Sequence, residues 1–364
     1  MKEPHLLALV TDAFGGRGGI AQYNRDLLTA LASDWSIEVL PRHAPDSTGP
    51  LPETLKQAKA RTGRLRYVIS AVLQARRSKP TSVFCGHLYM APLAALIAWL
   101  VGAKLIVQMH GIEAWQRPSR LQRWSVERAS LILCVSRYTR SRVLTWAAIT
   151  PERVCVLPNT IRPQFSLGDR LAARRRFKLE NQMVLLTVGR LAATERYKGQ
   201  DHVIAALSQL QAIESRDLIY LIAGEGDDRA RLESLVAQHG VLDKVRFLGA
   251  IDNQALPDLY RAADLFVMPS TGEGFGISFV ESMACGTPAF GLRDGGARDA
   301  LAVNANPGML ATYRDAESVF HNLRECLSRL SPDFNAALLA SNVQNSFGRP
   351  LFARRALNLM QLFT

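Results

Sequence analysis

The sequence predicts an α/β protein with two doubly wound domains that face a central cleft. Apolar runs of strand length alternate with amphipathic stretches through the N-terminal half. Residues 158–177 interrupt this alternation with two prolines, a glycine and a cluster of arginines, and a second alternating set follows. Such alternation indicates parallel sheets with helices on both faces, whose ligands lie beyond the carboxyl ends of the strands.

The first domain is expected to span residues 1–165 and the second residues 166–345. Expected strands of the first domain are Leu6–Val10, Ile37–Leu40, Val83–His87, Leu105–His110, Leu131–Ser136 and Val154–Leu157, and its helices include Ala21–Leu31, Arg64–Arg77, Pro92–Val101, Arg120–Ala129 and Arg140–Ala147. Expected strands of the second domain are Val184–Val188, Leu218–Ala223, Val245–Leu248, Leu265–Met268 and Pro288–Leu292. Apolar residues at helical spacing after Pro350 predict a final helix, assigned to residues 346–364.

Composition indicates a globular cytoplasmic protein. Hydrophobic residues make up 48% and charged residues 21% of the 364 residues, which excludes a disordered chain. The five cysteines are odd in number, lack CxxC spacing and lie mostly in apolar runs, as free thiols in a reducing compartment do. No signal peptide is expected, and the longest apolar run, Leu88–Ala103, is shorter than the roughly 18–20 residues of a spanning helix.

The net charge of +12 is confined to the N-terminal part of the chain. Residues 1–168 hold 22 Lys and Arg against 10 Asp and Glu, whereas the remaining residues hold 22 of each. This asymmetry favours an anionic partner such as a membrane surface, a nucleic acid or a phosphorylated acceptor, although solvated arginines would also explain it. A nucleic acid is not expected, because only 7% of residues are aromatic and no nucleic-acid-binding module is recognisable.

One stretch of this basic half is amphipathic. Leu65, Val68, Ile69, Val72 and Leu73 share one face of an expected helix, and Arg61, Arg64, Arg66, Arg76, Arg77 and Lys79 surround that face. Such a helix can lie peripherally on an anionic membrane leaflet. The alternative is an ordinary helix whose apolar face covers the sheet.

The most informative stretch is STGEGFGISFVESMACGTPAFG, residues 270–291. A strand-like run enters a glycine-rich turn, and a helix-like run leaves it at Gly276, so backbone N–H groups and a helix N-terminus can meet an anionic ligand. Glu273 precedes the helix and Glu281 lies eight positions later, so the two carboxylates can accept hydrogen bonds from two parts of one elongated polar ligand. Alternatively, Glu273 complements the helix dipole and Glu281 is an exposed helical residue.

This stretch resembles the signature of the retaining GT-B glycosyltransferases of family 4 (glycosyl transferases group 1), which include many bacterial polysaccharide and lipid-linked sugar transferases. The signature, two glutamates around a GFG core, is met by Glu273, Phe275, Gly276 and Glu281. The resemblance implies that Glu273 and the backbone after it, with Phe275, Gly276 and Ile277, hold the donor sugar, and that Glu281 holds the ribose. It also implies the GT-B fold, with the C-terminal helix crossing back to the first domain.

Two corners of the first domain carry further resemblance. Gly15, Gly16, Gly18 and Gly19 form a turn before a helix, which is a phosphate cradle in general terms but lacks the GxGxxG spacing of dinucleotide sites. The family's comparable loop implies that Gly18 and Gly19 approach the donor diphosphate. His110 ends a strand before Gly111 and Glu113. A lone histidine there is more often structural, but the family's HG(x)E corner implies that His110 contacts the donor sugar and is not a general base.

Arg190 and Lys198 bracket the loop that opens the second domain. A leaving diphosphate needs fixed cations or a metal ion, and no DxD sequence stands at an expected strand end. The two residues resemble the family's GR…KG pair, which implies transfer without a metal or another cofactor. The spacing is longer here than in the common form, so Arg196 remains an alternative to Lys198. The GEG corner with Gly224 and the FLG corner with Gly249 resemble the parts that line the nucleotide base.

The expected function is therefore the transfer of a hexose from a UDP- or GDP-sugar, with retention and without metal. The expected acceptor is a saccharide or a lipid-linked (polyprenyl-linked) saccharide in cell-surface polysaccharide or glycolipid biosynthesis, with peripheral contact to an anionic membrane. The alternatives are a nucleotide-sugar epimerase of the same fold and a non-enzymatic protein that binds anions or nucleic acid. The resemblance is thinnest over residues 41–80.

Overall fold

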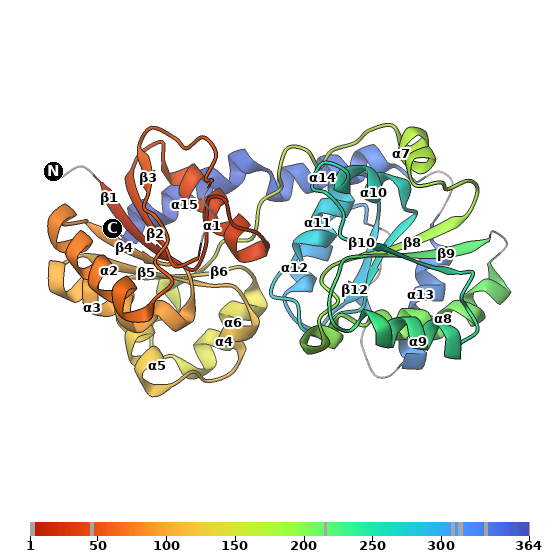
Figure 1. The fold of residues 1–364 in the computed structure, drawn as a ribbon, viewed down its shortest axis with the longest axis horizontal. Coiled ribbons are helices and arrows are strands. Elements are labelled where there is room, and N and C mark those ends of the chain that lie inside the picture. Colours follow the sequence, from red (N-terminus) through yellow and green to blue (C-terminus); the bar gives the residue numbers. More distant parts are fainter. Residues whose placement is uncertain are drawn as a thin grey trace. The chain divides into compact units, whose positions relative to one another are not determined.

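A computed structural model describes residues 4–43, 47–214, 217–306, 310–311, 316–330 and 334–363. Residue contacts divide the chain into two compact units (Figure 1). Unit 1 comprises residues 1–160 together with 349–364, and unit 2 comprises residues 161–348. The C-terminal helix therefore belongs to the unit that contains the N-terminus.

Unit 1 contains a seven-stranded parallel sheet, here sheet A, in the order β3-β2-β1-β4-β5-β6-β7. Its strands are β1 (His5–Val10), β2 (Ser36–Pro41), β3 (Leu55–Gln57), β4 (Ser82–Cys85), β5 (Lys104–Met109), β6 (Leu131–Cys134) and β7 (Val154–Val156). The central strands are almost entirely apolar because helices cover both faces of the sheet. The strand order reverses between β1 and β4.

The helices of unit 1 cover sheet A from two sides (Figure 1). They are α1 (Gly19–Leu31), α2 (Arg64–Ser78), α3 (Ala91–Val101), α4 (Ile112–Trp115), α5 (Arg120–Glu127), α6 (Arg137–Trp146) and α15 (Arg349–Phe363), with 3-10 turns η1 (Leu88–Met90) and η2 (Pro151–Arg153). Buried residues of α2, α3, α5 and α6 pack into one core with the sheet. On the opposite face α1 packs against α15.

Local sequence explains where these helices begin and end. A capping box closes the start of α5, because the Ser119 hydroxyl accepts from the Gln122 N–H and the Gln122 side chain accepts from the Ser119 N–H. The Ser136 hydroxyl caps α6 in the same position. Gly102 ends α3 in the left-handed conformation that glycine adopts at little cost. No helix of the described residues is long and apolar enough to cross a membrane.

Unit 2 contains a six-stranded parallel sheet, sheet B, in the order β10-β9-β8-β11-β12-β13. Its strands are β8 (Met183–Val188), β9 (Leu218–Ala223), β10 (Val245–Gly249), β11 (Leu265–Met268), β12 (Ala289–Leu292) and β13 (Leu310–Ala311). Here the order reverses between β8 and β11. The two sheets confirm the predicted α/β class with two doubly wound units.

Helices also cover both faces of sheet B. They are α7 (Arg170–Arg176), η3 (Ala193–Lys198), α8 (Gln200–Ile213), α9 (Arg229–Gln238), α10 (Leu256–Ala262), α11 (Ile277–Ala284), α12 (Ala297–Leu301), α13 (Ala316–Ser328) and α14 (Ala336–Phe347). Helices α8, α9 and α13 share one core with the sheet. Helix α11 packs against α10, α12 and α14, and α10 packs against α7.

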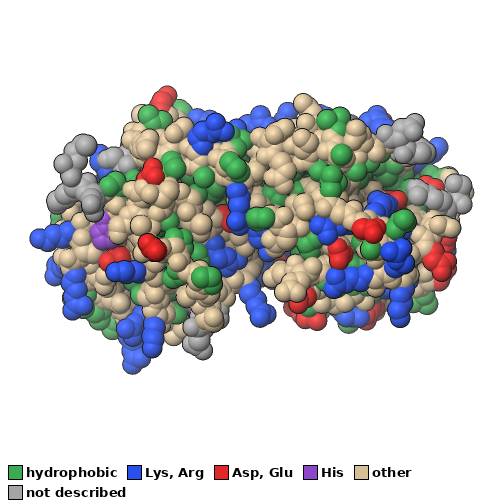
Figure 2. All heavy atoms as spheres, turned by 90° about the horizontal axis from the view of Figure 1, so that it is seen from above, with side chains coloured by type: hydrophobic (Ala, Val, Ile, Leu, Met, Phe, Trp, Pro, Cys, Tyr) green, Lys and Arg blue, Asp and Glu red, His purple; other side chains and the backbone are tan. Residues whose placement is uncertain are grey.

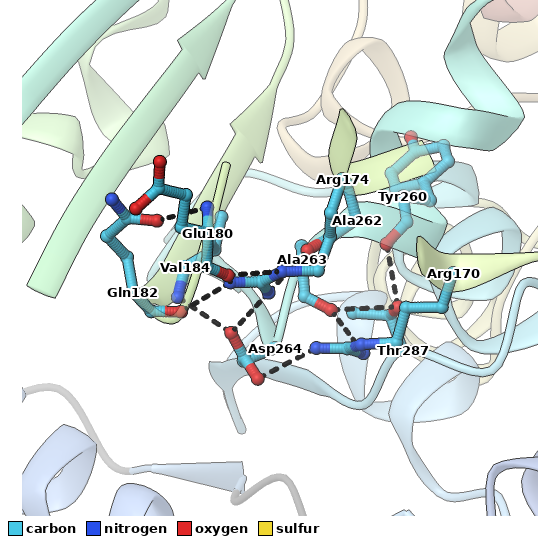
Figure 3. A network of polar contacts seen from close by, with 10 residues as sticks. All are labelled: Arg170, Arg174, Glu180, Gln182, Val184, Tyr260, Ala262, Ala263, Asp264 and Thr287. Atoms are coloured by element: carbon cyan, nitrogen blue, oxygen red, sulfur yellow. Dashed lines mark hydrogen bonds and ion pairs between the residues drawn. The ribbon is translucent and has the colours of Figure 1, made fainter. Parts of the chain in front are cut away.

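A buried arginine organises the amino ends of β8 and β11 (Figure 3). The Arg174 guanidinium of α7 donates to the carbonyls of Glu180, Gln182 and Ala262 and to the Asp264 carboxylate. Asp264 also accepts from Arg170 at 2.8 Å and from the Val184 N–H at 2.8 Å. This network, the Arg174 network below, ties α7, α10 and two neighbouring strands together.

Two sequence expectations about the strands need correction. The short strands β3 and β13 were not expected, because three and two residues carry too little periodicity to be recognised. The expected strands that ended at His87, His110 and Ser136 end earlier, at Cys85, Met109 and Cys134, so these three polar residues lie in the loops after the strands. The structure also bears on the two alternatives left open for α2. Leu65, Val68, Ile69 and Leu73 are exposed, Val72 is partly buried against the core, and Tyr67, Ala71 and Ala75 face the core. Most of the apolar stripe therefore does not cover the sheet.

Candidate functional site

Two loops of unit 2 meet where the strand order of sheet B reverses. One follows β8 and the other follows β11, and in open α/β sheets such a reversal is where ligands bind. The Thr271 N–H donates to the Tyr197 carbonyl at 2.9 Å, which joins the two loops. Gly199 has φ 78°, and a Cβ there would lie 2.6 Å from the Pro269 carbonyl oxygen. The close approach of the loops thus depends on a glycine at this position.

Glu195 lies between the two cations that were predicted to bind a diphosphate. Its carboxylate accepts from Lys198 Nζ at 2.6 Å and forms an ion pair with Arg190. The side chains of Lys198 and Glu195 are each 11% exposed, whereas that of Arg190 is 78% exposed. The structure thus brings Arg190 and Lys198 together around one carboxylate. Arg196, the alternative to Lys198, turns away and pairs with Asp228 at 2.9 Å.

Glu273 lies in the loop after β11, close to this cluster. Burial raises the pKa of its carboxyl group, and the charge of Glu195 adds to this effect. Lys198 and a 3.4 Å hydrogen bond from Ser270 oppose the rise. Burial, together with the charges of Glu195 and Glu273, raises the pKa of Tyr197 to about 12. Glu273, Glu195, Lys198, Arg190 and Tyr197 therefore form one polar cluster, called the β8–β11 cluster below.

Glu281 is not an exposed helical residue. Its carboxylate is 8% exposed, accepts from Arg162 at 3.0 Å and accepts from the Tyr260 hydroxyl at 3.2 Å. Tyr260 is itself placed by α10, whose carbonyl at Tyr260 accepts from the Thr287 hydroxyl at 2.7 Å (Figure 3). Glu281 is thus held in a fixed position by protein partners.

Between the two glutamates the chain changes direction. Gly276 has φ 82° and precedes α11, which begins at the partly exposed Ile277. The Phe275 side chain is 3% exposed and packs edge to face on Phe347, with ring centroids 5.3 Å apart. Its ring is therefore a packing group, and only the backbone of Phe275 remains to meet a ligand.

The two glycine corners after β9 and β10 also come together. Gly224 donates its N–H to the Gly249 carbonyl at 2.8 Å. A Cβ on Gly224 would lie 1.8 Å from the Gly189 carbonyl oxygen, so this corner packs directly on the loop after β8. Both acids of the adjacent Asp227–Asp228 pair have protein partners, namely the Ala193 N–H for Asp227 and two arginines for Asp228.

Unit 1 has a second polar group, at the carboxyl ends of β4 and β5. His110 Nε2 lies 2.9 Å from the Gly86 carbonyl oxygen, and the His110 N–H donates to Glu113 at 2.5 Å. Since a carbonyl oxygen only accepts, Nε2 carries a proton and Nδ1 is the acceptor of a neutral ring. Burial lowers the pKa of both His110 and the neighbouring His87, whose ring centroids are 6.2 Å apart. Glu113 opposes this in both cases.

The glycine turn of unit 1 lies before α1, beyond the end of β1. Gly18 has φ 91°, and nothing lies within 4 Å of a Cβ built on Gly18 or Gly19. Arg25 holds the turn by donating to the carbonyls of Ala13 at 2.7 Å and Gly16 at 2.6 Å. Thus the Gly18–Gly19 backbone has open space beside it, as close approach of a ligand requires.

Sequence reasoning missed several residues of these groups. Glu195 lies in the insertion that lengthens the spacing before Lys198, and this insertion was the available signal. Arg162 lies in the interruption between the two domains, where the sequence predicted an interdomain hinge near residues 160–175, and its pairing with Glu281, 119 positions away, leaves no local pattern. His87 was placed inside a strand. No group of three or more His, Cys, Asp or Glu side chains arranged to hold a metal ion occurs in the ranges that the structure describes.

Two family models match the chain. The family described as "Glycosyltransferase Family 4" matches residues 17–165, and the one described as "Glycosyl transferases group 1" matches residues 169–330. The two matches meet near the boundary between the units. Together they cover Gly18, Gly19 and His110 in unit 1 and the β8–β11 cluster in unit 2.

Similar proteins point to the same family. A 2-deoxystreptamine glucosyltransferase of Streptomyces kanamyceticus is 27% identical over 291 residues, which are 74% of each chain. A D-inositol 3-phosphate glycosyltransferase of Geodermatophilus obscurus is 35% identical over 189 residues, 49% of this chain and 41% of that protein. The crystal structure of Anabaena HepE in complex with UDP superimposes with a TM-score of 0.79 at 20% identity and covers 98% of this chain and 99% of that one. The chain therefore belongs to the family 4 glycosyltransferases with the GT-B fold.

Proposed function

We propose that this glycosyltransferase moves a hexose from a UDP- or GDP-sugar to a saccharide or lipid-linked saccharide, with retention of configuration and without a metal ion. The observation that carries the proposal is the β8–β11 cluster, in which Arg190 and Lys198 share one carboxylate beside Glu273. Two neighbouring cations at a strand reversal suit the departing diphosphate, whose charge grows as its bond to the sugar breaks. HepE, a structural neighbour, was solved with UDP-glucose.

Each unit would contribute residues to donor binding, as the family resemblance implies. Arg190 and Lys198 bind the diphosphate once it displaces Glu195 from between them. Glu273 accepts hydrogen bonds from sugar hydroxyls, and the neutral His110 ring offers Nδ1 as a further acceptor. The amides at Gly18, Gly19, Gly276 and Ile277 meet anionic oxygens, and Gly224 and Gly249 allow the base to lie against the backbone. Glu281 reaches the ribose from the position that Arg162 and Tyr260 give it.

The reaction then follows from this arrangement. The bond between the anomeric carbon and the diphosphate oxygen breaks, and Arg190 and Lys198 stabilise the negative charge that develops on the diphosphate. The acceptor hydroxyl attacks the same face of the sugar and forms the new glycosidic bond. Its proton passes to the departing phosphate oxygen, and His110 orients the sugar and transfers no proton.

The proposal covers two classes of acceptor, saccharides and lipid-linked saccharides. Two relatives are named for acceptors that are cyclic polyols, 2-deoxystreptamine and D-inositol 3-phosphate. A first acceptor panel should contain these two compounds beside oligosaccharides and polyprenyl-linked saccharides. Peripheral contact with an anionic membrane on the cytoplasmic side belongs to the same proposal, because a lipid-linked acceptor is presented at such a surface.

A thermal-shift screen with chelator present tests the donor. UDP-, GDP- and ADP-sugars are added to the wild type and to Glu281→Gln, which keeps an acceptor for Tyr260. One nucleotide class should raise the Tm of the wild type and raise that of Glu281→Gln less, because a ligand that binds the folded state stabilises it. No shift with any sugar nucleotide would reject the proposal. The anomeric configuration of the product, read by NMR, tests retention.

A further inference from the structure

The outer side of helices α2, α3 and α5 in unit 1 is apolar. Helix α3 packs between α2 and α5 on one side of sheet A (Figure 1). Large side chains point away from the sheet on all three helices: Leu65, Val68, Ile69 and Leu73 on α2, Leu96, Trp99 and Leu100 on α3, and Leu121 and Trp124 on α5. Trp99 is 77% and Leu65 is 72% exposed. Apolar side chains gathered over neighbouring elements indicate an interaction surface.

The same region is strongly basic. Residues 54–112, which include α2 and α3, contain nine Lys and Arg and no Asp or Glu. Figure 2 shows Lys and Arg side chains projecting from the outer rim of unit 1. On α5 the Arg128 guanidinium lies 3.6 Å from the centre of the exposed Trp124 ring. An indole beside a cation suits the boundary between headgroups and acyl chains.

A basic pocket opens beside this apolar surface, where α2 and α3 end. It has a volume of about 470 Å³ and is lined by Arg76, Lys79 and Lys104, with the exposed Leu100 at its side. Lys79 ends α2 with φ 45°, in the left-handed conformation that glycine adopts most easily, so this position holds a cation where helices often have glycine. Lys104 also lines a second pocket of about 500 Å³ with Arg153 and Leu362. No Asp or Glu lines either pocket in the described part of the chain.

We propose that this surface, called the α2–α3–α5 surface, docks on an anionic phospholipid bilayer, with a lipid phosphate held in the pocket of Arg76, Lys79 and Lys104. Charge complementarity decides the occupant, because an apolar surface bordered by cations matches acyl chains beneath anionic headgroups. The proposal deepens the proposed function and rests on its lipid-linked acceptor, since docking would bring the enzyme to that acceptor.

Co-flotation with vesicles tests the proposal on the full chain. The wild type should bind phosphatidylglycerol vesicles, bind phosphatidylcholine vesicles weakly, and lose binding as salt rises. The pocket variant Arg76→Gln/Lys79→Gln/Lys104→Gln should bind the anionic vesicles about 100-fold more weakly, since it removes three cations that attract the anionic headgroups. The apolar variant Leu65→Gln/Ile69→Gln/Trp99→Gln should also lose about ten-fold.

Matched changes in unit 2 provide the control. Arg175→Gln/Lys178→Gln/Arg324→Gln removes three exposed cations of unit 2 and should leave vesicle binding unchanged. Equal binding by the wild type and both surface variants, or no binding of the wild type to anionic vesicles, would overturn the proposal. So would a dimer that the apolar variant converts to monomer by size exclusion, because the surface would then bind a second copy.

Donor binding separates the two proposals. Titration of the sugar nucleotide without lipid should give the same Kd for the wild type, the pocket variant and the apolar variant. A protein that binds vesicles but no sugar nucleotide would refute the proposed function and leave the docking surface standing. A protein that binds the sugar nucleotide but no vesicles would refute the docking surface and leave the proposed function standing.

Discussion

Strands β8 and β11 have an arginine paired with a carboxylate at both ends, but the arginine is buried at the amino ends and exposed at the carboxyl ends. At their amino ends, Arg174 is 10% exposed and donates to three backbone carbonyls besides Asp264. At their carboxyl ends, Arg190 is 78% exposed, and it shares Glu195 with Lys198. One arginine is fixed by the main chain, and the other is held by a side chain that can turn away.

This difference separates a structural ion pair from a binding site. Backbone carbonyls do not leave, so the Arg174 network stabilises the fold and has no capacity for a ligand. At the carboxyl ends a carboxylate occupies the position between two cations that an anionic ligand could take instead. We therefore expect substitutions in the Arg174 network to change stability, and substitutions in the β8–β11 cluster to change donor affinity.

The largest expected effect is on stability. Arg174→Ala should lower the free energy of unfolding by about 3–5 kcal/mol, because three backbone carbonyls lose their donor and the Asp264 carboxylate loses one of its partners. Urea unfolding measures this. The exposed neighbour Arg175→Ala is the matched control and should stay within about 0.5 kcal/mol of the wild type. A loss of unfolding free energy below about 1 kcal/mol for Arg174→Ala would contradict the structural role of the Arg174 network.

The next effect is on donor affinity. Lys198→Ala should weaken binding of the sugar nucleotide about 10- to 100-fold, since a hydrogen bond to a charged group contributes about 1.5–3 kcal/mol. Its unfolding free energy should change far less than that of Arg174→Ala. Arg196→Ala, on the same 3-10 helix but paired with Asp228, is the control for calorimetric titration. Equal losses of affinity in both variants would show that Lys198 has no special role.

A smaller effect of opposite sign is expected at Glu195. Glu195→Gln removes the negative charge that competes with the diphosphate for Arg190 and Lys198, so UDP should bind a few-fold more tightly. Titration at low and high salt measures the gain, which should shrink as salt screens the charges. Weaker binding would mean that Glu195 is needed to hold the two cations in place.

The smallest effect concerns the pH dependence of unit 1. The pKa values of His110 and His87 are lowered by burial, so the stability that their neutral forms contribute is present above about pH 6.5, the ordinary value, and is lost as pH falls through the folded pKa. Donor affinity should fall only at the lower end of this window, as pH falls through the folded pKa of His110, because protonation removes the Nδ1 acceptor. His110→Gln should flatten this fall, whereas the exposed His239→Gln should not. An unchanged pH profile in His110→Gln would exclude this role.

The sequence was informative where the chain is periodic or matches a family signature. Central strands such as β1 and β9 were expected within a residue of their bounds, because nearly continuous apolar runs have few alternatives. The family was predicted from the signature in residues 270–291. The α/β class with doubly wound sheets was predicted from the alternation of apolar and amphipathic stretches. The short strands β3 and β13 escaped because their pairing with neighbouring strands, and not their own residues, defines them.

The sequence did not predict which side chains that lie far apart along the chain pair with one another. The positions of Glu273 and Glu281 were recognised, but Arg162 and Tyr260, which hold Glu281, come from other elements. The orientation of α2 was open for a similar reason. Its large apolar stripe would suit a core, yet Tyr67, Ala71 and Ala75 pack inward, and a helix pattern alone does not show which face meets the sheet.

The central claim is that the β8–β11 cluster binds the diphosphate of a sugar nucleotide without a metal ion. Its most direct test is calorimetric titration of UDP-glucose and of a GDP-hexose, with chelator present, into the wild type and into Arg190→Ala/Lys198→Ala. The account predicts that one donor binds the wild type and that the double variant, folded as judged by its unchanged urea midpoint, loses that binding. Equal affinity in the double variant, or binding only after a divalent metal is added, would contradict the account.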